Sequence, residues 1–193
     1  MEDKKWSERV ERVGVVHSPF RMATGTPVQN YASRGHEGGL DPAKECVEGV
    51  VVDPRGGRGT LEVDPRWEGA LSDLAGLDRI WVIFWLDRST PAKAKVLPYR
   101  DTVERGLFST RAPSRPNPIG MSCVRLLGVA GRFVHVCELD ILDGSPLLDI
   151  KPYVAEYDSF PDAKRGWLDE PSVKPGPLAA DARFEREINS PPG

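Results

Sequence analysis

The sequence has no long apolar run and few cysteines. None of its apolar segments approaches the roughly 18 residues of a membrane-spanning helix, and residues 1–6 contain no apolar stretch typical of a signal peptide. Its three cysteines, Cys46, Cys123 and Cys137, are widely spaced and odd in number, so they indicate neither a disulfide framework nor a zinc site. We therefore expect a cytoplasmic protein with reduced thiols and no association with membranes.

The glycine-rich motifs of the common nucleotide-binding folds are also absent. No Gly-x-Gly-x-x-Gly follows an expected strand, and the segment 56–59 (GGRG) matches neither that pattern nor a phosphate-binding loop. The usual dinucleotide-binding and common methyltransferase fingerprints are thus absent. Any nucleoside cofactor must be held by another device.

Negative charge is missing from one part of the chain. A net charge of −3 argues against a generally basic nucleic-acid-binding protein. Between Arg105 and Cys137, however, there is no aspartate or glutamate, and this window holds Arg105, Arg111, Arg115, Arg125 and Arg132. Such a positive patch suits a carboxylate, a phosphate or an RNA backbone. The alternative, arginines that alternate outward on strands, applies best to Arg125 and Arg132.

Prolines stiffen the loop 106–120. They are Pro113, Pro116 and Pro118. Each fixes its own φ and pushes the preceding residue toward extended backbone. A loop with little freedom to lose can hold polar side chains such as Arg111, Arg115 and Asn117 toward a ligand at low entropic cost. A rigid connection between strands is the alternative interpretation.

Strands dominate the expected secondary structure. They cover residues 10–17, 47–52, 60–63, 80–86, 121–129 and 133–142, and a long loop spans 22–44. The run 80–86 is entirely apolar, which favours a strand buried on both faces. One helix is expected between Asp64, as its N-cap before Pro65, and Gly76. Residues 180–188 favour a short helix that would need a surface to dock on.

Asp149, Lys151 and Tyr153 lie at alternate positions of an extended segment and therefore on one face of it. An ion pair between Asp149 and Lys151 is the structural alternative to a chemical role. The spacing of Asp140, Asp143 and Asp149 fits no cation-binding loop, and Lys151 would repel a metal ion. We therefore predict no metal site.

Four segments are shared, in order, with a known family. They are Val13–Phe20, Ile80–Leu86, Gly106–Met121 and Leu142–Tyr153. The most specific is the pattern Phe-x-Thr-Arg-x-Pro-x-Arg-Pro-Asn-Pro-Ile-Gly at residues 108–120. With these segments the chain resembles the TsaA-like (YaeB-like) family, the tRNA threonylcarbamoyladenosine N6-methyltransferases.

The resemblance implies a mainly β fold: a compact single β-barrel domain over residues 1–167, with one or two short helices and no Rossmann sheet. A Pro-rich tail, residues 168–193, follows. The resemblance also implies S-adenosylmethionine as cofactor, tRNA as partner, and a homodimer with the cofactor site near the subunit interface. Matching motif to motif, the implied cofactor contacts are Pro27, Val28, Gln29, Asp87, Arg88, Arg111, Leu142, Asp143, Gly144, Ser145 and Pro146.

On this resemblance, the leading hypothesis is methyl transfer from S-adenosylmethionine to N6 of threonylcarbamoyladenosine in tRNA. Arg115 and Asn117, together with Arg111, would bind polar groups of the cofactor or the threonyl carboxylate, because a guanidinium can hold a carboxylate at two points. Candidates for orienting the acceptor or acting as its base are Asp149, Lys151 and Tyr153. Two alternatives stay open: methylation of another RNA or a small molecule, and a non-catalytic dimeric sensor of S-adenosylmethionine.

Overall fold

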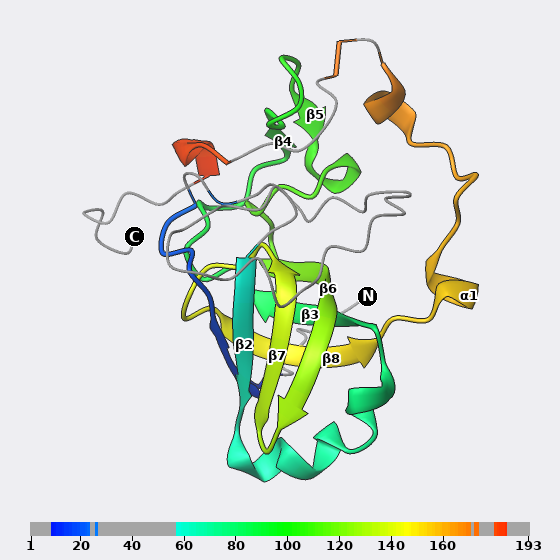
Figure 1. Ribbon diagram of the computed structural model, residues 1–193. Helices are drawn as coiled ribbons and strands as arrows, with labels where there is room; N and C mark the ends of the chain where they lie inside the picture. Colours follow the sequence, from blue (N-terminus) through cyan, green and yellow to red (C-terminus); the bar gives the residue numbers. More distant parts are fainter. Residues whose placement is uncertain (1–8, 24–25, 27–56, 171, 174–179, 185–193) are drawn as a thin grey trace, which may run out of the picture.

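The computed structural model describes residues 9–23, 26, 57–170, 172–173 and 180–184. Six strands in this part form a closed barrel in the order β1-β2-β7-β6-β3-β8, with every neighbouring pair antiparallel (Figure 1). The strands are β1 Gly14–His17, β2 Gly57–Val63, β3 Arg79–Trp85, β6 Ile119–Ala130, β7 Phe133–Leu139 and β8 Pro146–Pro152. The prediction of a mainly β barrel is confirmed. The strand expected at 47–52 and most of the loop at 22–44 lie outside the described residues.

Alternate residues of each strand point into the barrel and form its core. On β3, Ile80, Val82 and Phe84 are buried, whereas the residues between them remain partly exposed. The expectation that 80–86 is buried on both faces was therefore wrong, because a barrel covers only the inner face of its strands. The buried core consists of Val16, Leu61, Val63, Ile80, Val82, Phe84, Val124, Leu126, Val134, Val136, Leu139, Ile141 and Leu147.

The helix expected between Asp64 and Gly76 consists of two short 3₁₀ helices, η1 (Pro65–Leu71) and η2 (Leu74–Gly76). The predicted start is right: the Asp64 carboxylate accepts a hydrogen bond of 3.0 Å from the backbone N–H of Arg66. The single helix is wrong because Asp73 adopts a left-handed φ of 65°, which interrupts the turn between them. Both helices lie at one end of the barrel (Figure 1).

The opposite end of the barrel carries the chain between β3 and β6, here called the cap (residues 86–118; Figure 1). It contains β4 (Lys95–Val96), β5 (Arg105–Gly106) and η3 (Leu107–Ser109). Its small apolar core is formed by Val96, Leu107 and Ala112, joined by Phe184 from the C-terminal part of the chain.

The chain after β8 runs back to the cap through α1 (Ala155–Asp158), η4 (Gly166–Asp169) and η5 (Ala182–Phe184). The ring of Phe184 packs edge-on against Tyr99 with 5.2 Å between centroids, and its carbonyl accepts a hydrogen bond of 3.3 Å from the N–H of Thr90. Part of the Pro-rich tail thus docks on the cap. The helix expected at 180–188 is a 3₁₀ turn where the chain is described, and residues 185–193 lie outside that part.

Cys123 and Cys137 form no disulfide in the described part of the chain. Burial raises the pKa of both thiols, so both stay protonated at neutral pH. Over the same residues, no cluster of side chains could hold a metal ion. No helix there is long and apolar enough to cross a bilayer.

Gly14 in β1 is required by the close approach of β2. A Cβ at Gly14 would lie 2.3 Å from the carbonyl oxygen of Glu62, a backbone atom held by strand pairing. We expect Gly14→Ala to lower the free energy of unfolding by about 1–3 kcal/mol, the usual range for overpacking. Chemical denaturation monitored by tryptophan fluorescence measures this.

The matched control is Gly128→Ala, because Gly128 also lies in a strand but a Cβ there would meet nothing within 4 Å. Its denaturation midpoint should equal or exceed that of the wild type. Equal midpoints for both variants would show that β1 and β2 do not approach so closely.

Candidate functional site

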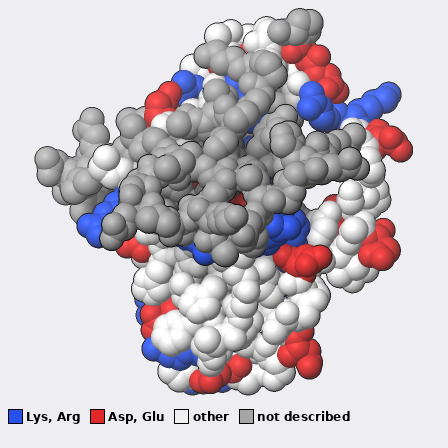
Figure 2. All heavy atoms as spheres, in the orientation of Figure 1, with Lys and Arg blue, Asp and Glu red and all other residues white. Residues whose placement is uncertain are grey.

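A cavity of about 1200 Å³ lies between the cap and the adjoining end of the barrel. Its lining comes from the chain after β1, the end of β3, the cap, the start of β6 and the turn before β8, with Trp167, Leu168, Ala180 and Phe184 from the C-terminal part. Figure 2 shows Lys and Arg beside Asp and Glu side chains at the level where cap and barrel meet, above strands that present mainly uncharged side chains. The lining of the cavity itself contains more arginine than aspartate: Arg21, Arg88, Arg100, Arg111 and Arg115 against Asp87 and Asp140.

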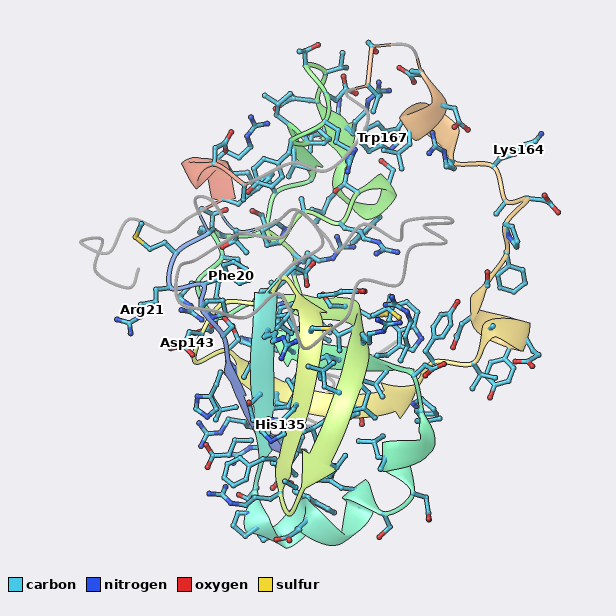
Figure 3. The ribbon with its side chains drawn as sticks, in the orientation of Figure 1. Phe20, Arg21, His135, Asp143, Lys164 and Trp167 are labelled. Carbon is cyan, nitrogen blue, oxygen red and sulfur yellow. The ribbon has the colours of Figure 1, made fainter. Side chains whose placement is uncertain are left out.

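One wall of the cavity is fixed by the junction between the end of β1 and the turn before β8. The backbone N–H of Ser18 donates to Oδ1 of Asp143 (3.0 Å), and the Ser18 hydroxyl donates to the carbonyl of Ile141 (2.7 Å). Gly144, at a φ of 78°, donates its N–H to the carbonyl of Val16 (2.8 Å). Asp143 lies beside the end of β1 (Figure 3) and is a structural residue of this junction. It does not line the cavity, whereas Leu142 and Ser145 do.

Arg88 connects the end of β3 to the same turn. Its Nη2 donates to the carbonyl of Asp143 (2.8 Å) and to the hydroxyl of Ser145 (3.0 Å). Its Nε is buried without a hydrogen-bond partner in the described structure. The Nε lies 3.4 Å from Oδ1 of Asp87, close enough for an ion pair but not aligned for a hydrogen bond. The structure thus brings Asp87 and Arg88, two predicted cofactor contacts, next to residues 142–145.

The arginines of the stiffened loop differ in their contacts. Nη1 of Arg115 donates to the carbonyls of Thr110 (3.1 Å) and Ala112 (3.3 Å), so this side chain braces the loop itself. Arg111 is exposed, lines the cavity and makes no hydrogen bond or ion pair with the residues that the structure describes. Asn117 is exposed and lies outside the cavity lining.

Asp140 and Ser122 were not predicted as site residues, yet both line the cavity. The Ser122 hydroxyl donates a short hydrogen bond to Oδ1 of Asp140. Ser122 is buried because it lies on the inner face of β6, in register with Gly120 and Val124. That alternation is the signal in the sequence that would have placed a hydroxyl at this end of the barrel.

Asp149 and Lys151 lie on the outer face of β8 and do not line the cavity. Their side chains form an exposed ion pair of 2.8 Å, and the hydrogen bond to Asp149 raises the pKa of Lys151. Tyr153 packs against Trp81 with 5.8 Å between the ring centroids. The structural alternative, an ion pair, is therefore present. Pro27, Val28 and Gln29 lie outside the described residues, and Gly144 and Pro146 do not line the cavity.

The cap and the C-terminal part of the chain are joined through Arg105. Its guanidinium bonds Asp101 (2.7 Å) and Glu170 (2.6 Å) and lies 5.3 Å from the ring centroid of Trp167. Burial of the Asp101 side chain opposes ionisation, but the hydrogen bonds from Arg105, Thr102 and Val103 outweigh it and lower the pKa of Asp101. The carboxylate is thus charged at neutral pH and the pair holds the second wall of the cavity.

Residues 15–159 match the family model described as the tRNA-methyltransferase O N-terminal domain. The chain belongs to this family. The resemblance drawn from the four motifs is confirmed, as is the barrel fold that it implied.

The chain is also similar to curated relatives and to solved structures whose descriptions fit this family. A Pyrococcus abyssi protein described as a probable S-adenosyl-L-methionine-binding protein is 36% identical over 89% of this chain and 82% of its own length. The crystal structure of TrmO from Pseudomonas aeruginosa superimposes with a TM-score of 0.62 at 30% identity, over 85% of this chain and 64% of that chain. The mouse tRNA (adenine(37)-N6)-methyltransferase is 42% identical over 48% of this chain, which spans only 22% of the mouse protein.

Proposed function

We propose that the chain is an S-adenosylmethionine-dependent methyltransferase that acts on N6 of adenosine in tRNA, with threonylcarbamoyladenosine as the acceptor. Family membership supports the reaction class, and the names of relatives agree with the predicted cofactor. The observation that carries the proposal is the set of polar side chains in one cavity. Arg111 has no partner among the described residues, while Arg88 is hydrogen-bonded to Ser145 and Asp140 to Ser122.

The residues of the cavity fit this cofactor. About 1200 Å³ exceeds the roughly 300–1000 Å³ of most small-molecule sites, which leaves room for part of an acceptor as well. Phe84, Ile141 and Leu142 supply apolar wall for a purine ring. The unsatisfied Nε of Arg88 offers a buried donor. Opposite charges suit the zwitterionic end of the cofactor: Arg111 for its carboxylate, and Asp87 and Asp140 for its positively charged groups.

When bound, the cofactor supplies a methyl group already activated on a sulfonium. The protein then has mainly to align acceptor and donor, and such alignment can contribute roughly 7–11 kcal/mol to lowering the barrier. Arg111 would hold the carboxylate end at two points, while the Ser122 hydroxyl orients the Asp140 carboxylate toward the reacting end. The braced loop keeps Arg111 in place because Arg115 ties its backbone.

Substitution of Arg111 tests the cofactor site. Arg111→Ala should weaken binding of S-adenosylmethionine at least tenfold, because a charge-assisted contact to the carboxylate is lost. Isothermal titration calorimetry measures the dissociation constant. Arg125→Ala is the matched control, since Arg125 is an exposed arginine of β6 outside the cavity. An unchanged dissociation constant for a folded Arg111→Ala variant contradicts the assignment.

Methyl transfer tests the reaction and the acceptor. We expect label from S-adenosylmethionine in tRNA taken from a strain that lacks the methylated base, and much less in a transcript with unmodified adenosine. Nucleoside analysis after digestion locates the label. Equal transfer to both RNAs would reject threonylcarbamoyladenosine as the preferred acceptor. Binding of the cofactor without transfer to any tRNA would reject the enzyme and favour a sensor.

A homodimer is part of the proposal and is supported by the outer face of β3 and β6. There, Trp85 pairs with Ile119 and Ile83 with Met121, which gives a partly exposed apolar strip. Ile119 and Met121 also line the cavity, so the strip borders the site. Asp149 is paired with Ile83 on the other side of the strip. If a second copy packs here, Asp149, Lys151 and Tyr153 of one protomer can approach the acceptor bound in the cavity of its partner.

We expect a dimer in solution that Met121→Asp converts to a monomer, because a charge would be buried in an apolar interface. Leu127→Asp is the control: Leu127 lies on the same strand and is 38% exposed, against 47% for Met121, but is not in the cavity lining. Multi-angle light scattering gives the mass of each. A monomeric wild-type protein, or a dimer that survives Met121→Asp, contradicts the interface.

A further inference from the structure

Phe108 presents an aromatic ring at the rim of the cavity. It sits on η3, lines the cavity and is 80% exposed. The guanidinium carbon of Arg115 lies 5.8 Å from its ring centroid. Because Arg115 is also bonded to the carbonyls of Thr110 and Ala112, the cation beside this ring is fixed. A ring held at a cavity rim and backed by a cation is suited to a flat, electron-rich ligand.

Trp167 brings a second aromatic ring to the same cavity. Its indole N–H donates a hydrogen bond of 2.8 Å to the carbonyl of Ser109, the residue after Phe108. Arg105 lies over its ring and is itself held by Asp101 and Glu170. Trp167 belongs to η4, and Figure 3 shows its side chain at the level of the cap. The residue lies beyond position 159, where the match to the family ends.

These contacts are typical of surfaces that bind unpaired bases. Bases of single-stranded RNA stack on aromatic side chains, and neighbouring arginines add cation–π and phosphate contacts. Arg105 and Arg115 each accompany one ring, and the stretch from Arg105 to Cys137 contains no acidic residue. Arg105 is already paired with Asp101 and Glu170 and serves to hold Trp167. Arg115, in contrast, bonds backbone carbonyls and no carboxylate among the described residues, so its charge stays uncompensated. A protein partner would have to bury that charge, whereas an RNA phosphate neutralises it.

We propose that Phe108 and Trp167 form a stacking platform at the rim of the cavity, which holds unpaired bases of the RNA loop that carries the acceptor adenosine. This inference rests on the proposed function and adds the element that selects a single-stranded loop. It also gives the chain after residue 159 a role in substrate binding, because that part supplies one of the two rings.

The test compares variants in tRNA binding, turnover and cofactor binding. Phe108→Ala should raise both KM for tRNA and the dissociation constant of a labelled anticodon stem-loop by roughly 5- to 150-fold, which corresponds to the loss of one stacked base. Phe108→Tyr should stay close to the wild type. The dissociation constant of S-adenosylmethionine should change less than about twofold, because a binding loss confined to RNA leaves the cofactor contacts intact.

Phe160→Ala is the matched control, since Phe160 is 72% exposed but does not line the cavity. Trp167→Phe provides a second readout: RNA should quench tryptophan emission of the wild type, and this variant should lose part of that quenching. Because Phe108 is so exposed, its removal should leave the denaturation midpoint unchanged.

The outcomes separate this inference from the proposed function. Transfer by the wild type, with normal KM and RNA affinity for Phe108→Ala, overturns the platform and leaves the function intact. RNA binding that weakens in Phe108→Ala while no tRNA is methylated supports the platform and rejects the function. An equal loss in Phe160→Ala or in cofactor affinity overturns the platform, as does an effect confined to dimerisation.

Discussion

The closure of the barrel between β1 and β8 is the constraint on which the site depends. Ser18 is bonded to both Asp143 and Ile141, and Gly144 to Val16, so the first strand is fastened to the turn that precedes the last one. Arg88 joins this junction from the end of β3. The bonds that close the barrel therefore also fix one wall of the cavity, and a left-handed residue at Gly144 makes the turn possible.

The second wall is held in a different way. Within the described residues, no strand pairing joins the cap to the C-terminal chain. The two are joined by the charges of Asp101, Arg105 and Glu170, by the indole of Trp167 and by the ring of Phe184. A barrel closed by strand pairing thus faces a wall held mainly by side chains. The proposed cofactor contacts come from both walls, because Arg88 and Ser145 belong to the first and Arg111 to the cap.

Much of the barrel and part of the site could be predicted from the sequence. Strands are visible in the alternation of apolar and polar residues, and the motifs of the site follow one another along the chain in the order typical of the family. The predictions of a single helix at 64–76 and of burial on both faces at 80–86 were wrong. Asp73 interrupts the helix, and closure of the barrel leaves one face of β3 on the outside. Arg88, Arg111 and Ser145, which the motifs named as cofactor contacts, line one cavity. Spacing alone could not decide whether Asp149 and Lys151 pair with each other, and nothing local shows that Trp167 returns to Ser109.

The most direct test of the central claim is a crystal structure of the protein with S-adenosylhomocysteine. Our prediction is that the ligand lies between cap and barrel, with its carboxylate on Arg111 and its purine against Ile141 and Leu142. A ligand bound elsewhere on the barrel, or bound in this cavity without contact to Arg111, would contradict it.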